Sequence, residues 1–347
     1  MTPSAFTPPF LQLAPMEGVL DWVLRELLSE TGGVDRMVTE FVRVTDKLLP
    51  DHVFRRYCPE LEFGGQTRAG TPVFVQLLGG QPGPMAENAA RVVEIGAPGV
   101  DLNFGCPART VNRHDGGAAL LRDPERVFAI TRAVREAVPV SIPVTAKVRL
   151  GFDHKDFHRE IAHAAEAAGA AHLVVHARTK TEMYTPPAHW SYIRSMSENR
   201  TIPILANGDI WTVEDYARCV QESGAKRAAL GRGLVRSPWL ARAIRAHALG
   251  ERLALDFQPA TFLHRFFDAS VAYRGEAYAV ARLKQILRYW APADSRFALW
   301  FTRAKVMQQL AEVHLLLTEI RLEEEKCHPY KFTPGPTVPT ACARKIC

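Results

Sequence analysis

Residues 99–110 read GVDLNFGCPART and join a short apolar run to a turn that carries a cysteine. The run at 100–103 has the length and apolar content of a buried strand. A tight turn follows, and Pro107 restricts the backbone directly after Cys106. A cysteine in the loop directly after a strand can present a reactive thiol, although a lone cysteine is more often a small buried hydrophobe. The rest of the chain must therefore decide the role of Cys106.

Similar apolar runs recur along residues 10–252, and helical patterns separate them. We expect strands at 11–14, 38–42, 73–77, 100–103, 144–148, 172–176, 203–207 and 227–231. Apolar residues at helical spacing predict helices at 21–29, 85–95, 124–137, 157–168 and 213–223, with Asp123 and Thr212 as N-caps. This alternation predicts an α/β fold, a (β/α)₈ TIM barrel, whose usual size is about 250 residues. The competing doubly wound sheet would need a G-x-G-x-x-G fingerprint, which the sequence lacks.

The barrel is expected to be followed by a small all-helical domain at 253–325. Its helices are predicted at 262–272, 278–290 and 297–324. The two ends of the chain, 1–9 and 326–347, are rich in proline and are expected to be loose tails. Three of the six cysteines lie in the second tail, and the sequence assigns them no role.

The composition bounds the function without fixing it. A net charge of +6 and a pI near 9.0 permit an acidic partner such as RNA but do not require one. The cysteines form no C-x-x-C pair and are too few for a disulfide scaffold, which favours a reducing cytoplasm. We expect neither a signal peptide nor a transmembrane helix.

Chemistry in a barrel of this kind sits where the strands end. Polar residues stand at these ends: Glu17, Glu40, Arg43, Gln76, Asn103, Cys106, Lys147, Arg149, His176, Arg178, Asn207, Asp209 and Arg232. Each alone is more often structural, but together on one rim they indicate a planar polar cofactor with a phosphate tail. The glycine-containing loops after the last two strands, at 207–209 and 231–233, would offer backbone N–H groups to the phosphate. We find no metal-ligand set and no Ser-His-Asp arrangement, whereas a flavin fits.

Several of these motifs resemble those of the tRNA-dihydrouridine synthase family. They are LAPMEGV at 13–19, DLNFGCP at 101–107, KVR at 147–149, HART at 176–179, NGD at 207–209 and GRG at 231–233. Three further stretches, TEFVRV at 39–44, CPEL at 58–61 and VQLLG at 75–79, are similar to the bacterial C branch, which acts on uridine 16 of tRNA. The resemblance runs from about residue 11 to about residue 305.

The resemblance implies an enzyme that holds FMN, is reduced by NADPH and reduces the C5–C6 bond of a D-loop uridine. Hydride would pass to C6, and Cys106 would protonate C5. The residues implied to hold FMN are Pro15, Met16, Glu17, Gln76, Lys147, His176, Arg178, Asn207, Gly208, Asp209, Gly231 and Arg232. Those implied to contact tRNA are Arg43, Asn103, Tyr184, Arg282, Lys284 and Arg303, with Asn103 facing the uracil. The family pattern also implies a monomer that binds neither a metal nor a membrane.

Two departures and three alternatives stay open. Phe104 and the stretch 113–115 differ from the residues usual in relatives, and both belong to the expected substrate loop. Lys284 and Arg288 share a helix face at i,i+4, but Arg282 lies off it, so no tidy basic stripe is predicted. The alternatives are a synthase acting on uridine 20, an FMN barrel acting on a small molecule, and a non-enzymatic RNA-binding protein.

Overall fold

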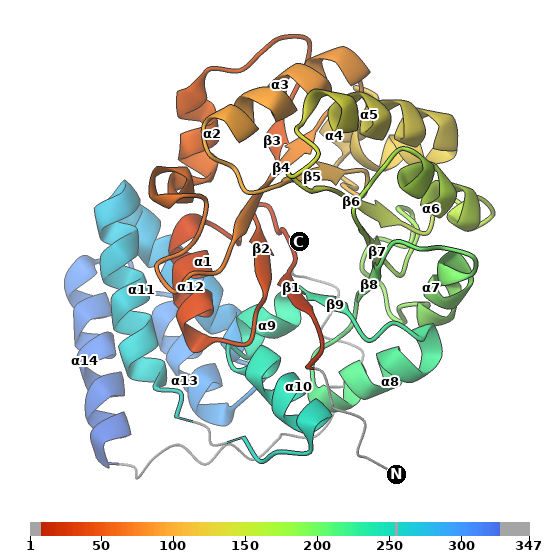
Figure 1. Cartoon of the computed structure of the whole chain (residues 1–347). Coiled ribbons are helices and arrows are strands. Elements are labelled where there is room, and N and C mark those ends of the chain that lie inside the picture. The colour runs from red at the N-terminus through yellow and green to blue at the C-terminus, as the bar shows by residue number, and fades with distance from the viewer. Residues whose placement is uncertain (1–7, 254–255, 327–347) are drawn as a thin grey trace.

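Eight parallel strands close into a barrel in the computed structural model, which describes residues 8–253 and 256–326. The strands are β1 (Leu11–Leu13), β2 (Arg36–Val38), β4 (Val73–Leu78), β5 (Val100–Asn103), β6 (Val144–Arg149), β7 (Leu173–His176), β8 (Ile204–Asn207) and β9 (Ala228–Leu230). The ring closes because β1 pairs with both β2 and β9, and β2 pairs with β4. Figure 1 shows this ring with helices around it. The predicted (β/α)₈ barrel is therefore confirmed.

The second strand differs from the prediction, which placed it at 38–42. It ends at Val38, and the chain pairs again only at β3 (Val42–Arg43), against the far end of β4. Val38 faces Phe74 and Val42 faces Leu77, so four steps on one side oppose three on the other. One extra residue interrupts the ladder in the manner of a β-bulge, and this splits the predicted strand in two.

Helices cover the outside of the barrel. The longer ones are α1 (Trp22–Thr31), α3 (Pro82–Glu94), α5 (Pro124–Ala137), α6 (His158–Ala167), α7 (Trp190–Ser197), α8 (Val213–Ser223) and α10 (Leu240–Leu249). Shorter turns are α2 (Asp51–Tyr57), α4 (Arg109–Asn112), α9 (Arg232–Arg236) and the 3₁₀ segments Pro59–Phe63 and Gly117–Arg122. The predicted N-caps are confirmed, since Asp123 Oδ1 accepts from Glu125 N–H and Thr212 Oγ1 accepts from Asp215 N–H, each at 3.1 Å.

The C-terminal region is helical, as predicted, but it contains four helices. They are α11 (Pro259–Arg274), α12 (Glu276–Trp290), α13 (Ser295–Ala304) and α14 (Leu310–Lys326). The single helix predicted at 297–324 is wrong. Arg303 pairs with Glu319, and Trp300 Nε1 donates to Glu323 at 3.1 Å, so α13 and α14 run antiparallel. The break lies at 305–309, where Glu312 accepts the N–H groups of Gln308 and Gln309 and thereby caps α14.

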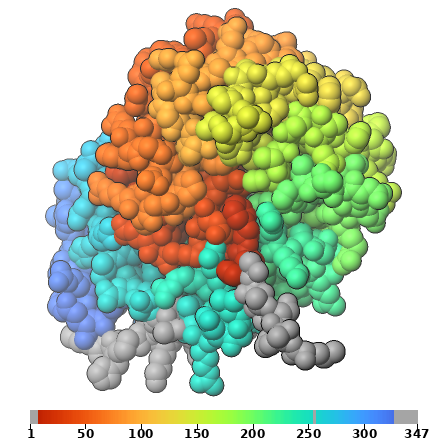
Figure 2. Space-filling view, viewed as in Figure 1, coloured from red at the N-terminus to blue at the C-terminus, as the bar shows by residue number. Residues whose placement is uncertain are grey.

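These helices pack against one side of the barrel, as the cyan and blue segments of Figure 2 show. Trp290 of α12 is buried among aromatic rings and donates its Nε1 hydrogen to the carbonyl of Val235 in α9 at 2.9 Å. Asp21, the N-cap of α1, accepts from Tyr278 Oη at 2.6 Å and from Arg282 Nε at 3.0 Å. The loop after β1 is therefore attached to α12. No helix within the described residues is long and apolar enough to span a bilayer.

Candidate active site

A cavity of about 630 Å³ lies at the carboxyl ends of the barrel strands. Gln76, Asn103, Lys147, His176 and Asn207 reach it from five successive strands, β4 to β8. Parallel strands that close a ring end on the same rim, so residues far apart in sequence meet there. The loop after β1, the loops after β8 and β9, and one face of α12 supply the remaining walls.

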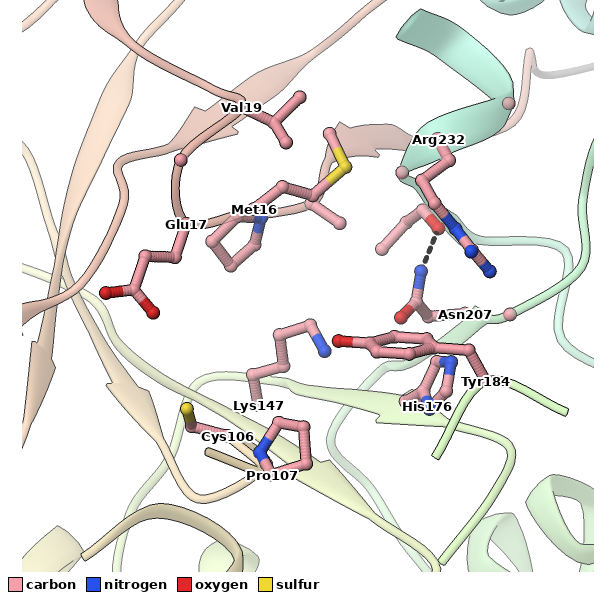
Figure 3. Close-up of a pocket in the computed structure, with 18 of the residues that line it drawn as sticks. Met16, Glu17, Val19, Cys106, Pro107, Lys147, His176, Tyr184, Asn207 and Arg232 are labelled. Atoms are coloured by element: carbon pink, nitrogen blue, oxygen red, sulfur yellow. Dashed lines mark hydrogen bonds between the residues drawn. The ribbon is translucent and has the colours of Figure 1, made fainter. Parts of the chain in front are cut away.

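The cavity gathers most of the predicted site. All of the predicted cofactor residues except Arg178 line it: Pro15, Met16, Glu17, Gln76, Lys147, His176, Asn207, Gly208, Asp209, Gly231 and Arg232. Cys106 lines it as well, together with the predicted substrate residues Asn103 and Tyr184. Figure 3 shows Cys106 and Lys147 on one side of the cavity, with Met16 across from them.

The loop that carries Cys106 is held by side chains on both sides of the cysteine. Asn103 Oδ1 accepts hydrogen bonds from the backbone N–H groups of Gly105 at 3.0 Å and Cys106 at 2.9 Å. Asn112 Nδ2 donates to the Cys106 carbonyl at 3.0 Å. Gly117 lies against that carbonyl with φ +58°, and a Cβ there would come within 2.9 Å of the oxygen. The backbone is thus fixed while the thiol faces the cavity.

The surroundings of Cys106 favour the protonated thiol. Burial is the largest influence and raises the pKa of Cys106, and the nearby carboxylate of Glu17 raises it further. The N–H of Ala108 and the cations Arg149 and Lys147 act in the opposite direction without reversing the shift. A thiol with a raised pKa stays protonated at neutral pH, which suits proton donation better than nucleophilic attack.

Lys147 brings a half-buried ammonium group to the cavity. Burial lowers the pKa of Lys147 to about 8, and the neighbouring Arg149 lowers it too, while Asp101 and Cys106 oppose the shift. Among the residues that the structure describes, no carboxylate forms an ion pair with this ammonium. A partly desolvated charge without a partner is costly, so this position fits a ligand that presents an electron-rich atom.

His176 ends β7 and Arg178 lies two residues beyond it, but the two differ in their surroundings. Burial, with nearby cations, lowers the pKa of His176, so its ring is neutral, and its buried Nδ1 has no partner within the described residues. Arg178 lies outside the cavity lining. Its Nε donates to the Thr185 carbonyl at 2.6 Å, and its Nη2 pairs with Asp209. Asp209 also accepts from Ala188 N–H at 2.9 Å, so Arg178 supports the loop after β8, while its buried Nη1 has no partner within the described residues.

Comparison with known proteins identifies the family of this chain. A family model described as "Dihydrouridine synthase (Dus)" matches residues 12–312. The chain belongs to the dihydrouridine synthase family. Its relatives include proteins named tRNA-dihydrouridine(16) synthase. The Pseudomonas putida protein is 47% identical over 88% of this chain and 96% of its own length. The Shewanella oneidensis protein is 48% identical over 82% and 91%, and the Haemophilus influenzae protein is 42% identical over 88% and 98%.

Solved structures share the fold of this dihydrouridine synthase at low sequence identity. A 2-naphthoyl-CoA reductase structure superposes with a TM-score of 0.53 at 12% identity, covering 70% of this chain and 50% of that one. Histamine dehydrogenase from Rhizobium sp. 4-9 superposes with a TM-score of 0.51 at 15% identity, covering 69% and 46%. At such identities the likeness is one of fold alone.

The synthase does not bring its other predicted tRNA residues into the main cavity. Arg43 lines a second cavity of about 340 Å³, next to the Cys106 loop. Arg282 is only 5% exposed and is held by Asp21 and by the carbonyl of Val19, to which it donates at 2.6 Å. Arg303 forms its ion pair with Glu319 on the neighbouring helix. Lys284, on α12, is half-buried and lies outside the lining of either cavity.

Several lining residues of the synthase were not among those predicted for the site, although Arg288 was noted on one helix face with Lys284. Gln285, Arg288 and Tyr289 form the α12 wall of the cavity. Their i, i+3, i+4 spacing places them on one helix face, a signal that could have found them once α12 was known to face the barrel. Trp211 lies beyond the predicted Asp209 in the same loop, and the guanidinium of Arg232 lies 5.1 Å from its ring and 4.9 Å from that of Tyr184. Aromatic faces on two sides hold this cation at the cavity.

The lining of the cavity also bears on metals. Within residues 8–253 and 256–326, no group of three or more His, Cys, Asp or Glu side chains is arranged to hold a metal ion. The donors that face the cavity are instead a thiol, an ammonium, an imidazole, a guanidinium and amides, a set suited to a polar organic ligand.

Proposed function

We propose that this dihydrouridine synthase reduces the C5–C6 double bond of uridine 16 in tRNA, with FMN as its bound cofactor and NADPH as the reductant. The observation that carries the proposal is the Cys106 thiol, which faces the cavity from a fixed loop. Relatives named for position 16 that align over 82–88% of the chain support the choice of uridine. A tRNA substrate also implies a cytoplasmic enzyme.

The residues of the cavity fit FMN. A volume of about 630 Å³ lies within the range of small-molecule and cofactor sites, about 300–1,000 Å³. The unpartnered Nδ1 of His176 and the unpaired ammonium of Lys147 would hydrogen-bond to polar atoms of such a ligand. Gly208 has φ +116°, and Gly231 lies in the following loop, so both expose backbone to the cavity where a phosphate would bind. When bound, FMN supplies the hydride that is added to C6.

The chain itself supplies a proton and a position for the base. The S–H bond of Cys106 breaks as a C5–H bond forms, which leaves a thiolate that solvent reprotonates before the next cycle. A fixed loop would keep the Cys106 sulfur at a constant distance from C5 of a bound uracil, and general acid catalysis requires such positioning. The ring of Tyr184, which has the guanidinium of Arg149 at 5.2 Å and that of Arg232 at 4.9 Å, would pack against the uracil or the cofactor.

The substrate must reach this cavity as an extruded base. A uridine inside a folded tRNA is stacked, and an enzyme that acts on its ring takes the nucleotide out of the stack. Gln285, Arg288 and Tyr289 form the α12 wall of the cavity, and we expect this wall to contact the nucleotides that flank such a base. Arg288 and Lys284 on this helix would meet RNA phosphates, which position the tRNA without reading its sequence.

The test is to map dihydrouridine in tRNA from a strain that lacks this gene. We expect dihydrouridine to be lost at position 16 and restored by the wild-type gene. Loss at position 20 with position 16 intact would overturn the assignment of the uridine. In a second arm, purified yellow protein should oxidise NADPH faster when unmodified tRNA is added. Protein without bound flavin, or with no response to tRNA, would contradict the proposed activity.

A further inference from the structure

We propose that Asp101 is a positioning residue that fixes the Cys106 loop through the side chains of Gln76 and Asn103. The inference rests on the proposed function in one respect, the use of Cys106 as proton donor. Asp101 does not line the cavity, and its side chain is fully buried inside the barrel. It acts on the reacting group only through its neighbours.

A continuous series of hydrogen bonds joins Asp101 to the loop. Gln76 Nε2 donates to Asp101 Oδ2 at 2.6 Å, and Asn103 Nδ2 donates to Gln76 Oε1 at 2.8 Å. Asn103 Oδ1 is then left to accept the N–H groups of Gly105 and Cys106 at 3.0 and 2.9 Å. The amides of Gln76 and Asn103 are thereby engaged at both ends within the protein.

The carboxylate gives this series its direction. Both oxygens of Asp101 accept hydrogen bonds, from Gln76 Nε2 and Thr145 Oγ1, whereas each amide has one donating and one accepting end. Asp101 therefore turns the NH₂ group of Gln76 toward itself and leaves the Gln76 oxygen for Asn103. That in turn directs the NH₂ group of Asn103 toward Gln76 and its oxygen toward the loop. If either amide turned over, two donors or two acceptors would face each other in a buried site, which is costly.

The strands on both sides keep Asp101 in place. In the sheet register Gln76 pairs with Asp101, and Asp101 pairs with Thr145, so the three side chains are neighbours on adjacent strands. Thr145 Oγ1 donates to Asp101 Oδ1 and fills the second oxygen. Burial raises the pKa of Asp101, while the hydrogen bonds from Thr145 and Gln76 and the charge of Arg36 oppose the rise. Lys147 adds a second nearby positive charge.

The decisive variant is Asp101→Asn, which keeps the shape and adds a donor. We expect the Cys106 thiol of the FMN-loaded enzyme, without tRNA, to be alkylated by iodoacetamide at least about fivefold faster, as followed by mass spectrometry of the Cys106 peptide. Reduction of the bound flavin by NADPH should stay within about twofold of wild type, and its reoxidation by tRNA should slow at least about tenfold. If Asp101 had a merely structural role, Asp101→Asn would lower the stability of the protein and leave the ratio of these two rates unchanged.

Three further variants test the result independently. Thr145→Val removes the second hydrogen bond to Asp101 and should speed alkylation by about two- to fivefold, whereas Thr145→Ser should restore the wild-type rate. Thr131→Val is the matched control, because its buried hydroxyl has no partner in the part of the chain that the structure describes. If Asp101→Asn does not fold, Thr145→Val carries the test. Wild-type alkylation and reoxidation in both variants would overturn the inference.

Failure of this inference can be told apart from failure of the proposed function. Alkylation is measured without tRNA, so it reports on the loop whatever the substrate is. If Cys106→Ala still forms dihydrouridine, the proton-donor role falls. If Cys106→Ala is inactive and Asp101→Asn behaves as wild type, only the positioning role falls.

Discussion

The barrel rim and the C-terminal helices both carry polar residues that the family resemblance assigns to ligands, but the two regions treat these residues differently. At the rim, the Lys147 ammonium has no carboxylate partner and His176 Nδ1 has no partner at all within the described residues. On the helices, Arg282 is buried against Asp21, and Arg303 pairs with Glu319. Polar groups without partners at the lining of a cavity indicate a ligand, whereas charges satisfied by neighbouring side chains indicate architecture.

The first prediction tests the rim at its thiol. Cys106→Ala should lower the rate of dihydrouridine formation by about 10²–10⁴-fold, the usual contribution of a general acid, with FMN content unchanged. Single-turnover assays with unmodified tRNA and mass spectrometry of the nucleosides would measure it. Cys219→Ala is the matched control, because Cys219 is buried in α8 away from the cavity. If the rate of Cys106→Ala stayed within tenfold of wild type, the proposed role of the Cys106 thiol at the rim would be contradicted.

The second prediction tests the architectural reading of the helices. Arg282→Ala leaves the Asp21 carboxylate buried without its cation and should lower the free energy of unfolding by about 3–5 kcal/mol. Denaturant unfolding would measure the change. Lys284→Ala, on the same helix, should stay within about 0.5 kcal/mol of wild type. If Arg282→Ala kept full stability but lost tRNA binding, Arg282 would belong with the ligand-binding residues instead.

The third prediction concerns the pH dependence of the unpaired ammonium. The pKa of Lys147 is lowered to about 8, so the charge is present below that pH and lost above it. If the charge binds FMN, the dissociation constant should rise by up to about tenfold per pH unit above 8. Flavin fluorescence titrations between pH 7 and 9 would measure it. Lys147→Met should bind more weakly at pH 7 and show a flatter profile, and an unchanged wild-type profile would contradict the contact.

The fourth prediction, for which we expect the smallest effect, concerns the contribution of Arg303 to stability and to tRNA binding. Its ion pair with Glu319 is about one-third exposed on both sides, so its net contribution to stability should be about 0–1 kcal/mol. If the guanidinium also meets a phosphate, Arg303→Ala should weaken tRNA binding uniformly and lower the salt dependence by about one charge. Filter binding at several salt concentrations would measure both. Glu319→Gln is the counterpart, and it should leave tRNA affinity equal or slightly higher.

The barrel could be predicted from sequence because its signals are local. Short apolar runs that alternate with amphipathic helices can be recognised from their periodicity alone. The strand ends must then lie together, because parallel strands in a closed barrel all end at the same rim. The bulge after Val38 could not be read, since the extra residue shows only when Val42 is paired with Leu77. The helix predicted across 305–309 failed for a related reason, because the side-chain cap from Glu312 is invisible to periodicity.

The sequence predicted well which residues line the cavity, but less well which neighbours each of them contacts. Gln76 and Asn103 were expected to contact the ligands, and both line the cavity, but the sequence did not show that their amides also bond to Asp101 and to the Cys106 loop. Arg178 follows His176 by two residues, but it lies outside the cavity lining and pairs with Asp209. Residue type and strand position place a side chain near a rim. They do not reveal which polar neighbour it meets first, because that depends on contacts across the sheet.

Asp21 accepts hydrogen bonds from the first turn of α1 and, in α12, from Tyr278 and Arg282. Gln285 Nε2 adds a bond to the carbonyl of Gly18 at 2.9 Å, within the loop that brings Met16 to the cavity. Barrel and helices therefore share one cooperative unit, and calorimetry should record a single melting transition for the whole chain. The C-terminal helices are not a detachable module, because removing them would release the segment that forms one wall of the cavity.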